Sequence, residues 1–497
     1  MLIIPRESAY NNKAADRIKD QTDRCVVMQT PHIRDYQGKH VHMIGIGGSS
    51  MSGLSQMLME KGYRVSGSDN AQSHAVEKLQ TMGIPVTVGH KAENVHGADL
   101  VVYSAAILTD NPERREVERL HIPNMERAVL LGQLMEGYPT AVGICGTHGK
   151  TTTTAMLSQV LMEGGQDPTI HIGGRLDAVG GSTRIGSGDA FVAEACEFNG
   201  SFLHMRPTLA VVLNIEEDHL DYYKDIEDIQ KAFGKFLDLL PPQGLAIGCG
   251  DDPRVVSLFE NLPRKSETFG FGSQNDWQPA ELAYDERGRA TFIATRKGEA
   301  VCQVKMSVPG FFNVLNALAT LCAAYHMGAD MDRAAQSLHR FAGAHRRFEL
   351  TGVVQGVKLY HDYGHNPTEM RNVLSVAKMQ PHNRLWAVMQ PHTYSRVKQL
   401  FDDYLICTKE ADITLVTDIY AAREKDPGDI HASMIVEGMR KNGVDAYLTP
   451  TFDDTEAYLR AYWQPGDLVI TMGCGNINLL NEQIEQNERK AEKKAKS

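Results

Sequence analysis

Hydrophobic residues in this chain fall into short continuous runs, each followed by a loop rich in glycine or polar residues and then by a segment with helical periodicity. Such runs are typical of buried parallel strands, because helices cover both faces of a parallel sheet. We therefore predict an α/β fold made of repeated strand–loop–helix units. The predicted strands cover residues 40–44, 63–69, 98–104, 140–145, 189–197, 208–215, 357–362, 383–390, 412–418 and 467–473.

The length of the chain indicates several domains. With 497 residues it is too long for one ordinary hydrophobic core, and about three domains are expected. Tyr138-Pro139 is interpreted as a linker between the first two. We predict an N-terminal extension at 1–38, a first domain at 39–138, a central domain at 139–343 and a last domain at 344–497.

The composition excludes several classes of protein. Hydrophobic residues make up 42% and charged residues 23%, as in soluble globular proteins. The net charge of −11 argues against nucleic acid or an anionic membrane as the main partner. No window is apolar for ~18 residues, so no membrane span is expected, and the N-terminus lacks a signal-peptide pattern. The eight cysteines include no C-x-x-C pair, which predicts reduced thiols and a cytoplasmic location.

A glycine-rich loop follows the run at 140–145 and leads into a predicted helix. It begins Gly143-Ile-Cys-Gly-Thr-His-Gly and continues Lys150-Thr-Thr-Thr-Thr. Backbone N–H groups and the helix dipole point at an anion in such a turn. Lys150 can reach the terminal phosphates, and the Thr151 hydroxyl can ligate Mg²⁺. We predict a nucleoside triphosphate site. Five residues separate Gly143 from Gly149, where a P-loop has four, so a chance Gly-Lys-Thr turn is the alternative.

A second glycine turn, Gly45-Ile-Gly-Gly-Ser49, follows the first predicted strand. The next strand ends at Asp69, close to where the dinucleotide fingerprint places an acid that binds a ribose hydroxyl. Ser50 stands where the third glycine of that fingerprint belongs. This favours another diphosphate-bearing ligand over a nicotinamide cofactor.

Acidic and imidazole side chains follow two strands of the central domain. Glu194 closes an otherwise apolar stretch, where a charge needs a partner. Asp218 and His219 follow the next strand. Beside a phosphate loop, a carboxylate suits Mg²⁺, for which histidine is a less usual ligand. Asp218 either contributes to this site or caps the next helix.

Two asparagines and two arginines close the central domain. Asn313 and Asn316 are three residues apart, on one helical face. Their amides can donate to and accept from a purine edge, although a single asparagine is commonly a helix cap. Arg346 and Arg347 follow a Gly-Ala-His turn, and a guanidinium is well suited to phosphate.

Every predicted strand of the last domain ends in a polar cluster. These clusters contain Asp362-Tyr-Gly-His365, Gln390-Pro-His392, Asp418-Ile-Tyr420 and Gly473-Cys-Gly-Asn476. The carboxyl ends of parallel strands meet at one edge of a sheet, where α/β proteins bind substrates. One histidine alone is more often structural, but three such loops together predict a substrate-binding rim.

These motifs, in this order from residue 40 to about 480, resemble the Mur ligase family. They are Gly45-Ile-Gly-Gly, Ser66-Gly-Ser-Asp69, Gly146-Thr-His-Gly-Lys-Thr-Thr, Glu194, Asn214 through His219, Asn313 with Asn316, Arg346-Arg-Phe, Asp362-Tyr-Gly-His and Gln390-Pro-His. The resemblance implies a three-domain architecture: a Rossmann-like N-terminal domain that binds a UDP-sugar, a central P-loop ATPase domain and a Rossmann-like C-terminal domain that binds an amino acid. The chain departs from the family pattern at Ser50, Phe312, Asn366, Thr393 and Asn476.

The resemblance also implies roles for individual residues. The ATP-binding set is Gly146, Thr147, His148, Gly149, Lys150, Thr151, Thr152, Asn313, Asn316, Arg347 and Asp362. The implied catalytic residues are Lys150, Glu194, His219 and Arg347, and the implied Mg²⁺ ligands are Thr151, Glu194 and His219. The implied sugar-nucleotide contacts are Gly47, Gly48, Ser49, Asp69 and Ser104, and the L-alanine pocket is Tyr363, His365, His392 and Arg396.

The implied activity is that of the family members that join L-alanine to the lactyl carboxylate of UDP-N-acetylmuramate through an acyl phosphate, with release of ADP and phosphate, in peptidoglycan precursor synthesis. A murein peptide ligase, which joins a recycled tripeptide to the same sugar nucleotide, is the nearest alternative. A non-catalytic regulatory protein that uses ATP as a switch is the alternative from another class. We expect a monomer or weak homodimer.

Overall fold

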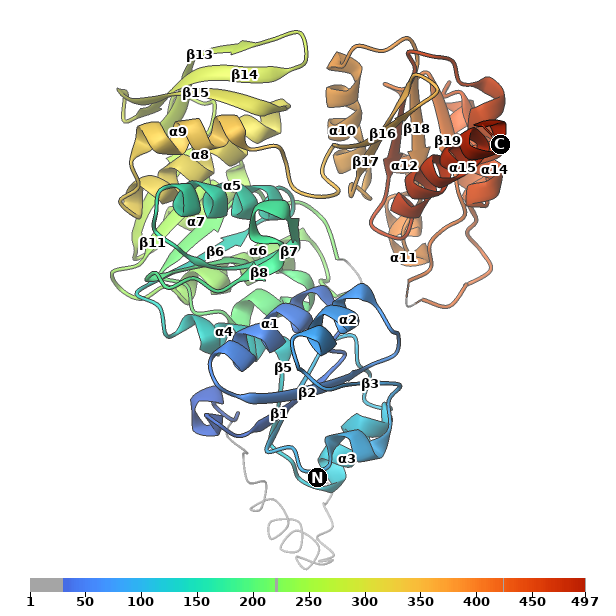
Figure 1. Ribbon diagram of the computed structural model, residues 1–497. Coiled ribbons are helices and arrows are strands. Elements are labelled where there is room, and N and C mark those ends of the chain that lie inside the picture. The colour runs from blue at the N-terminus through green and yellow to red at the C-terminus, as the bar shows by residue number, and fades with distance from the viewer. Residues whose placement is uncertain (1–29, 220–221, 423, 497) are drawn as a thin grey trace, which may run out of the picture.

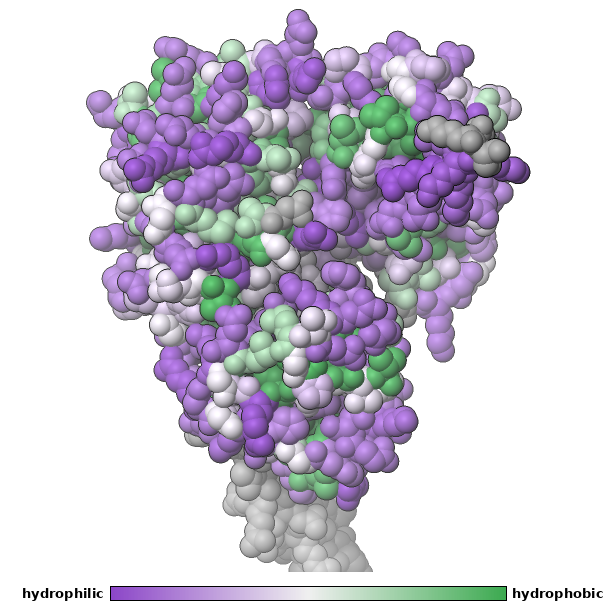
Figure 2. All heavy atoms as spheres, in the orientation of Figure 1, coloured by the Kyte–Doolittle hydropathy of each residue, from purple (hydrophilic) through white to green (hydrophobic). Residues whose placement is uncertain are grey.

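The computed structural model describes residues 30–219, 222–422 and 424–496. Most of the predicted extension, residues 1–29, lies outside these ranges. The described chain forms three sheets, each with its own helices (Figure 1). We call them the N-terminal, central and C-terminal units. Hydrophilic side chains cover most of the face in Figure 2. No helix among the described residues is both long and apolar enough to cross a bilayer.

The N-terminal unit is a parallel five-stranded sheet in the order β3-β2-β1-β4-β5. Its elements are η1 (Ile33–Tyr36), β1 (His40–Ile44), α1 (Ser49–Glu60), β2 (Arg64–Asp69), α2 (His74–Thr81), β3 (Val86–Val88), η2 (Ala92–Val95), β4 (Leu100–Tyr103), α3 (Pro112–Arg119), β5 (Asn124–Glu126) and α4 (Arg127–Met135). The strand order reverses between β1 and β4, and such a reversal opens a crevice at the carboxyl ends of the strands. The glycine turn follows β1 and Ser104 follows β4, so the predicted sugar-nucleotide residues border this crevice.

The central unit is a ten-stranded sheet in the order β15-β14-β13-β12-β11-β10-β6-β9-β7-β8. Its elements are β6 (Thr140–Cys145), α5 (Lys150–Glu163), β7 (Thr169–Leu176), η3 (Asp177–Val179), β8 (Gly181–Arg184), β9 (Ala190–Glu194), η4 (Phe198–His204), β10 (Leu209–Val212), α6 (Ile226–Asp238), β11 (Leu245–Cys249), α7 (Pro253–Phe259), β12 (Lys265–Phe269), β13 (Trp277–Tyr284), β14 (Arg289–Arg296), β15 (Glu299–Pro309), α8 (Phe311–His326) and α9 (Met331–Arg340). Strands β6 and β10 pair in parallel and are almost wholly buried. The phosphate loop therefore leaves the sheet at its centre.

The C-terminal unit is a six-stranded sheet in the order β16-β17-β21-β18-β19-β20, in which only β16 runs antiparallel to its neighbour. Its elements are β16 (Glu349–Val354), β17 (Val357–Asp362), α10 (Pro367–Met379), β18 (Leu385–Met389), α11 (Tyr394–Gln399), α12 (Phe401–Tyr404), β19 (Ile413–Val416), α13 (Ala432–Lys441), β20 (Ala446–Leu448), α14 (Phe452–Tyr462), β21 (Leu468–Met472) and α15 (Asn478–Lys496). The parallel strands β17, β21, β18 and β19 place the predicted polar clusters on one rim. The α/β architecture expected from the hydrophobic pattern is confirmed.

Candidate active site

The phosphate loop between β6 and α5 has a backbone that only glycine adopts readily. Gly146 has φ 144° and Gly149 has φ 84°, both in the left-handed region. A Cβ on Gly149 would also lie 2.6 Å from Asn316 Oδ1. Helix α5 begins at Lys150 without a side-chain cap, so N–H groups of its first turn remain for an anion.

Lys150 is held at the mouth of this loop. Its Nζ donates to the carbonyls of Gly146 (2.6 Å) and Thr147 (3.0 Å) and to Glu197 Oε1 (2.8 Å). Burial lowers the pKa of Lys150, but the Glu197 carboxylate outweighs burial and raises that pKa above its usual value, so the ammonium stays charged. The other Glu197 oxygen, Oε2, is buried and has no hydrogen-bond partner among the described residues.

Oxygen atoms suited to a hard cation gather next to Lys150. The Thr151 hydroxyl donates to Glu194 Oε1 (3.2 Å) and Oε2 (3.0 Å), and Glu194 Oε2 accepts from Gly173 N (2.7 Å). Nε2 of His219 lies 3.8 Å from Glu197 Oε1. A hydroxyl, a carboxylate and the unpartnered Glu197 oxygen fit Mg²⁺, whereas the imidazole is its less usual ligand.

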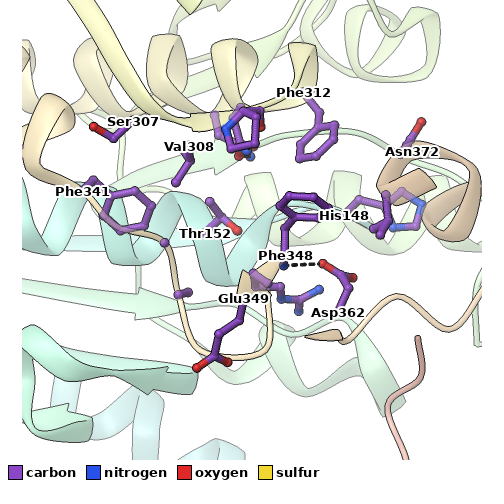
Figure 3. Close-up of a pocket in the computed structure, with 18 of the residues that line it drawn as sticks. His148, Thr152, Ser307, Val308, Phe312, Phe341, Phe348, Glu349, Asp362 and Asn372 are labelled. Carbon is purple, nitrogen blue, oxygen red and sulfur yellow. Dashed lines mark hydrogen bonds between the residues drawn. The ribbon is translucent and has the colours of Figure 1, made fainter. Parts of the chain in front are cut away.

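A cavity of 530 Å³ lies on one side of the phosphate loop. Phe312, Phe348 and His148 surround this space in Figure 3. Asn313 and Asn316 line it and form a pair, because Asn316 Nδ2 donates to Asn313 Oδ1 (3.1 Å). Asn316 Oδ1 in turn accepts from Thr153 Oγ1 (3.2 Å). The predicted adenine-side amides are thus coupled to the first turn of α5.

Asp362 and Arg347 are residues of the C-terminal unit that line this cavity. Asp362 accepts from the backbone N–H groups of Phe348 (2.7 Å) and Gly364 (2.6 Å), the first of which is dashed in Figure 3. Burial raises the pKa of Asp362 to about 6, although the nearby Arg347 guanidinium opposes the shift. Arg347 lies 4.9 Å from the ring centroid of Tyr363 and reaches Thr151 Oγ1 (3.5 Å).

A second cavity, of 780 Å³, lies on the other side of the loop, and all three units line it. We call it the acceptor cavity. The predicted site residues that line it are Ser49, Thr147, Lys150, Thr151, Glu194, His219, Arg347, Tyr363, His365, His392 and Arg396. Arg347 and Glu369 line both cavities, so the phosphate loop separates them only partly.

Four predicted sugar-nucleotide residues, Gly47, Gly48, Asp69 and Ser104, are not part of the lining of this cavity. Asp69 Oδ2 accepts from Gly47 N (2.8 Å), and a Cβ on Gly47 would lie 2.9 Å from the same oxygen. Asp69 therefore holds the glycine turn in place. Ser104 Oγ accepts from Ala106 N (3.3 Å). These residues lie at the carboxyl ends of β1, β2 and β4, and Ser49 and Ser50, which follow the same glycine turn, line the acceptor cavity.

Two charged contacts join the central and C-terminal units. His148 Nδ1 lies 3.1 Å from Glu369 Oε1, and its Nε2 lies 3.2 Å from Glu216 Oε2. Arg396 Nη2 donates to Asp218 Oδ1 (2.8 Å). His392 Nδ1 lies 3.1 Å from the Arg396 guanidinium. Asp218 lines the acceptor cavity. It does not cap α6, whose N-cap is Asp225.

Sequence reasoning assigned no role to several residues that the fold brings to these cavities. Glu369 lines both cavities, and Glu197 contacts Lys150 beside them. Each lies within four residues of a predicted site residue, Glu197 after Glu194 and Glu369 after His365. Arg127 and His171 carried no such signal, since they belong to different units and to no motif. Both line the acceptor cavity.

Comparison with known families covers most of the chain. Residues 40–139 match the model described as Mur ligase family, catalytic domain. Residues 144–324 match the Mur ligase middle domain, and residues 346–475 match the Mur ligase, glutamate ligase domain.

Individual relatives agree with these matches. The chain is 47% identical to the UDP-N-acetylmuramate–L-alanine ligase of Acetivibrio thermocellus, over 90% of this chain and 95% of that protein. It is 44% identical to the ligase of the same name from Caldanaerobacter subterraneus subsp. tengcongensis, over 91% and 98%. The crystal structure of UDP-N-acetylmuramate-alanine ligase from Thermotoga maritima superposes with a TM-score of 0.78 at 26% identity, over 91% of this chain and 100% of that one. The chain belongs to the Mur ligase family.

Proposed function

We propose that this protein is an ATP-dependent ligase that joins L-alanine to the lactyl carboxylate of UDP-N-acetylmuramate, with release of ADP and phosphate, in peptidoglycan precursor synthesis. One observation carries the proposal: the phosphate loop stands between a nucleotide-sized cavity and a cavity lined by all three units. A ligase that activates one substrate with ATP and then couples it to another needs this arrangement, because the phosphoryl donor and the amine must both reach the same carboxyl group. The 43–47% identity to ligases of this name supports the choice of substrates.

The chemistry requires two displacements. A carboxylate does not acylate an amine, because oxide is too poor a leaving group. An oxygen of the lactyl carboxylate attacks the γ-phosphorus of ATP, ADP leaves, and an acyl phosphate forms. The free amine of L-alanine then attacks the acyl carbon and expels phosphate. Lys150 and the loop N–H groups neutralise charge during the first step, and Arg347 is placed to do so from the C-terminal unit.

The nucleotide would occupy the 530 Å³ cavity, with its phosphates on the loop 146–152, Asn313 and Asn316 at the base, and Asp362 at the ribose. Thr151, Glu194 and His219 would hold Mg²⁺. The ion, when bound, screens the charge of the transferred phosphoryl group. The donor set supports this role, because Thr151 and Glu194 are already in contact and Glu197 offers a free oxygen.

The substrates would enter the acceptor cavity from two sides. The UDP group would lie against the crevice formed by Gly47, Gly48, Ser49, Asp69 and Ser104. L-Alanine would lie among Tyr363, His365, His392 and Arg396. The functional domains would then be residues 39–138, 139–343 and 344–497. Because ATP and sugar nucleotides are made inside the cell, we assign the activity to the cytoplasm, and we expect a monomer or weak homodimer.

The test is phosphate release from ATP and Mg²⁺ in the presence of UDP-N-acetylmuramate. L-Alanine, glycine, L-serine and the L-Ala-D-Glu-diamino acid tripeptide are compared as acceptors. Release that requires both the sugar nucleotide and L-alanine supports the proposal. Turnover with the tripeptide alone would identify a murein peptide ligase instead, and ATP binding without turnover by any acceptor would favour the regulatory switch.

A further inference from the structure

Arg127 is a partly buried cation that lines the acceptor cavity. It is the first residue of α4 in the N-terminal unit, and no carboxylate among the described residues lies within 4.0 Å of its guanidinium. Its Nη1 donates to the Ser50 hydroxyl (3.1 Å). Burial lowers the pKa of Arg127, yet a guanidinium remains charged in proteins. A desolvated cation that lines a cavity without an acidic partner is suited to an anionic ligand.

A chain of hydrogen bonds sets the direction of this guanidinium. Ser50 Oγ lies 2.7 Å from His171 Nε2, and His171 Nδ1 lies 3.1 Å from Thr183 Oγ1. Burial, with a smaller contribution from Arg127, lowers the pKa of His171 to about 3, so the imidazole is neutral. Arg127 can only donate, so Ser50 accepts from it and donates its own proton to Nε2. The remaining proton is then on Nδ1 and is donated to Thr183.

This chain crosses between two units. Ser50 and Arg127 belong to the N-terminal unit, whereas His171 on β7 and Thr183 on β8 belong to the central unit. Helix α1 lies directly on β8, because a Cβ on Gly53 would be 1.9 Å from Thr183 Oγ1. The arrangement accounts for the serine at the third glycine position of the first loop. A glycine there would leave both Arg127 and His171 without this partner.

We propose that Arg127 binds an anionic group of the acceptor, either the diphosphate or the lactyl carboxylate of the sugar nucleotide, and that Ser50, His171 and Thr183 are positioning residues that aim it. This inference rests on the proposed function, because it takes the acceptor to be a sugar nucleotide. Arg127 lines the same cavity as Lys150 and Glu194, so an anion bound to it is in the compartment where phosphoryl transfer would occur.

Calorimetric titration of the full chain tests the binding role. UDP-N-acetylmuramate and UDP-N-acetylglucosamine are the probes, because the second has the diphosphate but lacks the lactyl carboxylate. Arg127→Gln is expected to raise the Kd for UDP-N-acetylmuramate at least about tenfold, and Arg127→Lys to recover part of the loss. Arg115→Gln, on the exposed face of α3, is the matched control. Unchanged melting temperature and unchanged affinity for an ATP analogue verify that the variants fold.

The two probes show which anionic group of the sugar nucleotide Arg127 binds. A loss shared by both probes assigns Arg127 to the diphosphate, and a loss confined to UDP-N-acetylmuramate assigns it to the carboxylate. Wild-type affinity of Arg127→Gln for both probes overturns the inference and leaves the proposed function standing. If the wild-type protein binds neither probe, the proposed function fails as well.

A double-mutant cycle tests the positioning role. Ser50→Ala is expected to raise KM for the sugar nucleotide several-fold with little change in kcat, and Ser50→Thr, which keeps the hydroxyl, to restore it. Ser55→Ala is the control, since the Ser55 hydroxyl donates only to Met51 O of the same helix. If Ser50 acts through Arg127, Ser50→Ala has no further effect in the Arg127→Gln protein. Effects that add in the double variant would overturn this role.

Discussion

The imidazole of His148, in the phosphate loop, contacts the carboxylate of Glu369, at the start of helix α10 in the C-terminal unit, with 3.1 Å between Nδ1 and Oε1. Glu369 Oε2 also accepts from His365 N (2.9 Å). One carboxylate therefore links the loop expected to hold ATP to a residue expected to line the L-alanine pocket. This contact exists only when the two units are close together.

Glu369→Gln is expected to lower kcat by about ten- to a hundredfold, because small misplacements at a reacting centre are costly. Glutamine still completes the capping box of α10, so the helix itself should be preserved. Asp454→Asn is the matched control, since Asp454 occupies the same capping position in α14, away from both cavities. Phosphate release is the measurement, and an unchanged kcat would show that the contact does not matter for turnover.

The same contact predicts a pH dependence of stability. Burial lowers the pKa of His148, but Glu216 and Glu369 outweigh burial and raise it to about 10. Because folding raises this pKa, protonated His148 stabilises the folded state. The stabilisation is complete below the pKa of the unfolded state, about 6.5, and is lost as the pH rises towards 10. The melting temperature of the wild type should therefore exceed that of His148→Asn most near pH 6 and least near pH 10. A difference that stays constant over this range would contradict the assignment.

Lys150→Met is expected to reduce kcat by on the order of 10²–10³-fold or more, because it removes a charge that stabilises phosphoryl transfer. The change also leaves Glu197 buried without its cation, which destabilises the fold. The double variant Lys150→Met/Glu197→Gln should regain melting temperature but not activity. Phosphate release and thermal unfolding measured together separate the two effects. Recovery of activity in the double variant would exclude a catalytic role for Lys150.

Glu194→Gln is expected to raise the Mg²⁺ concentration needed for half-maximal activity at least about tenfold. The carboxylate contacts Thr151 directly and is the only charged member of that pair. Glu260→Gln, exposed at the end of α7, is the control. A Mg²⁺ titration of phosphate release is the measurement, and an unaltered requirement would remove Glu194 from the metal site.

Arg396→Met is expected to raise KM for L-alanine by about ten- to a hundredfold, because it removes a charged hydrogen-bond donor from the pocket. Asp218→Asn should have a smaller effect in the same direction, since Asp218 orients Arg396 from the central unit. Lys398→Met lies on the same helix but pairs with Asp429 (2.6 Å) at the surface, and it should leave KM unchanged. If all three variants had the wild-type KM for L-alanine, L-alanine would have to bind elsewhere.

Much of the local structure could be predicted. The run at 140–145 became β6 with the same limits, and the glycine turn after it became the phosphate loop, because both features depend on neighbouring residues alone. The ends of two predicted strands differ from the structure. The stretch predicted at 189–197 forms a strand only as far as Glu194, and the one at 208–215 only over Leu209–Val212. At the carboxyl end of each of these strands, the chain turns out of the sheet, and the polar residues that follow lie at the site.

The site itself was predictable only in part. Residues in recognisable motifs, such as Lys150 and Asn316, line the cavities as expected. The bond between Ser50 and His171 joins residues 121 positions apart. The sequence marks Ser50 only as a departure from the glycine pattern, and His171 belongs to no motif. A hydroxyl or an imidazole becomes informative only when its burial and its partner are known.

Hydrophobic periodicity and turn chemistry are local properties, so the sequence by itself determined the α/β class, the phosphate loop, and the rims where polar residues collect. The packing of one unit on another depends on surfaces assembled from distant segments. Only the tertiary structure therefore decided that His148 contacts Glu369, that Arg396 contacts Asp218, and that Ser50, the partner of Arg127, contacts His171 of the central unit.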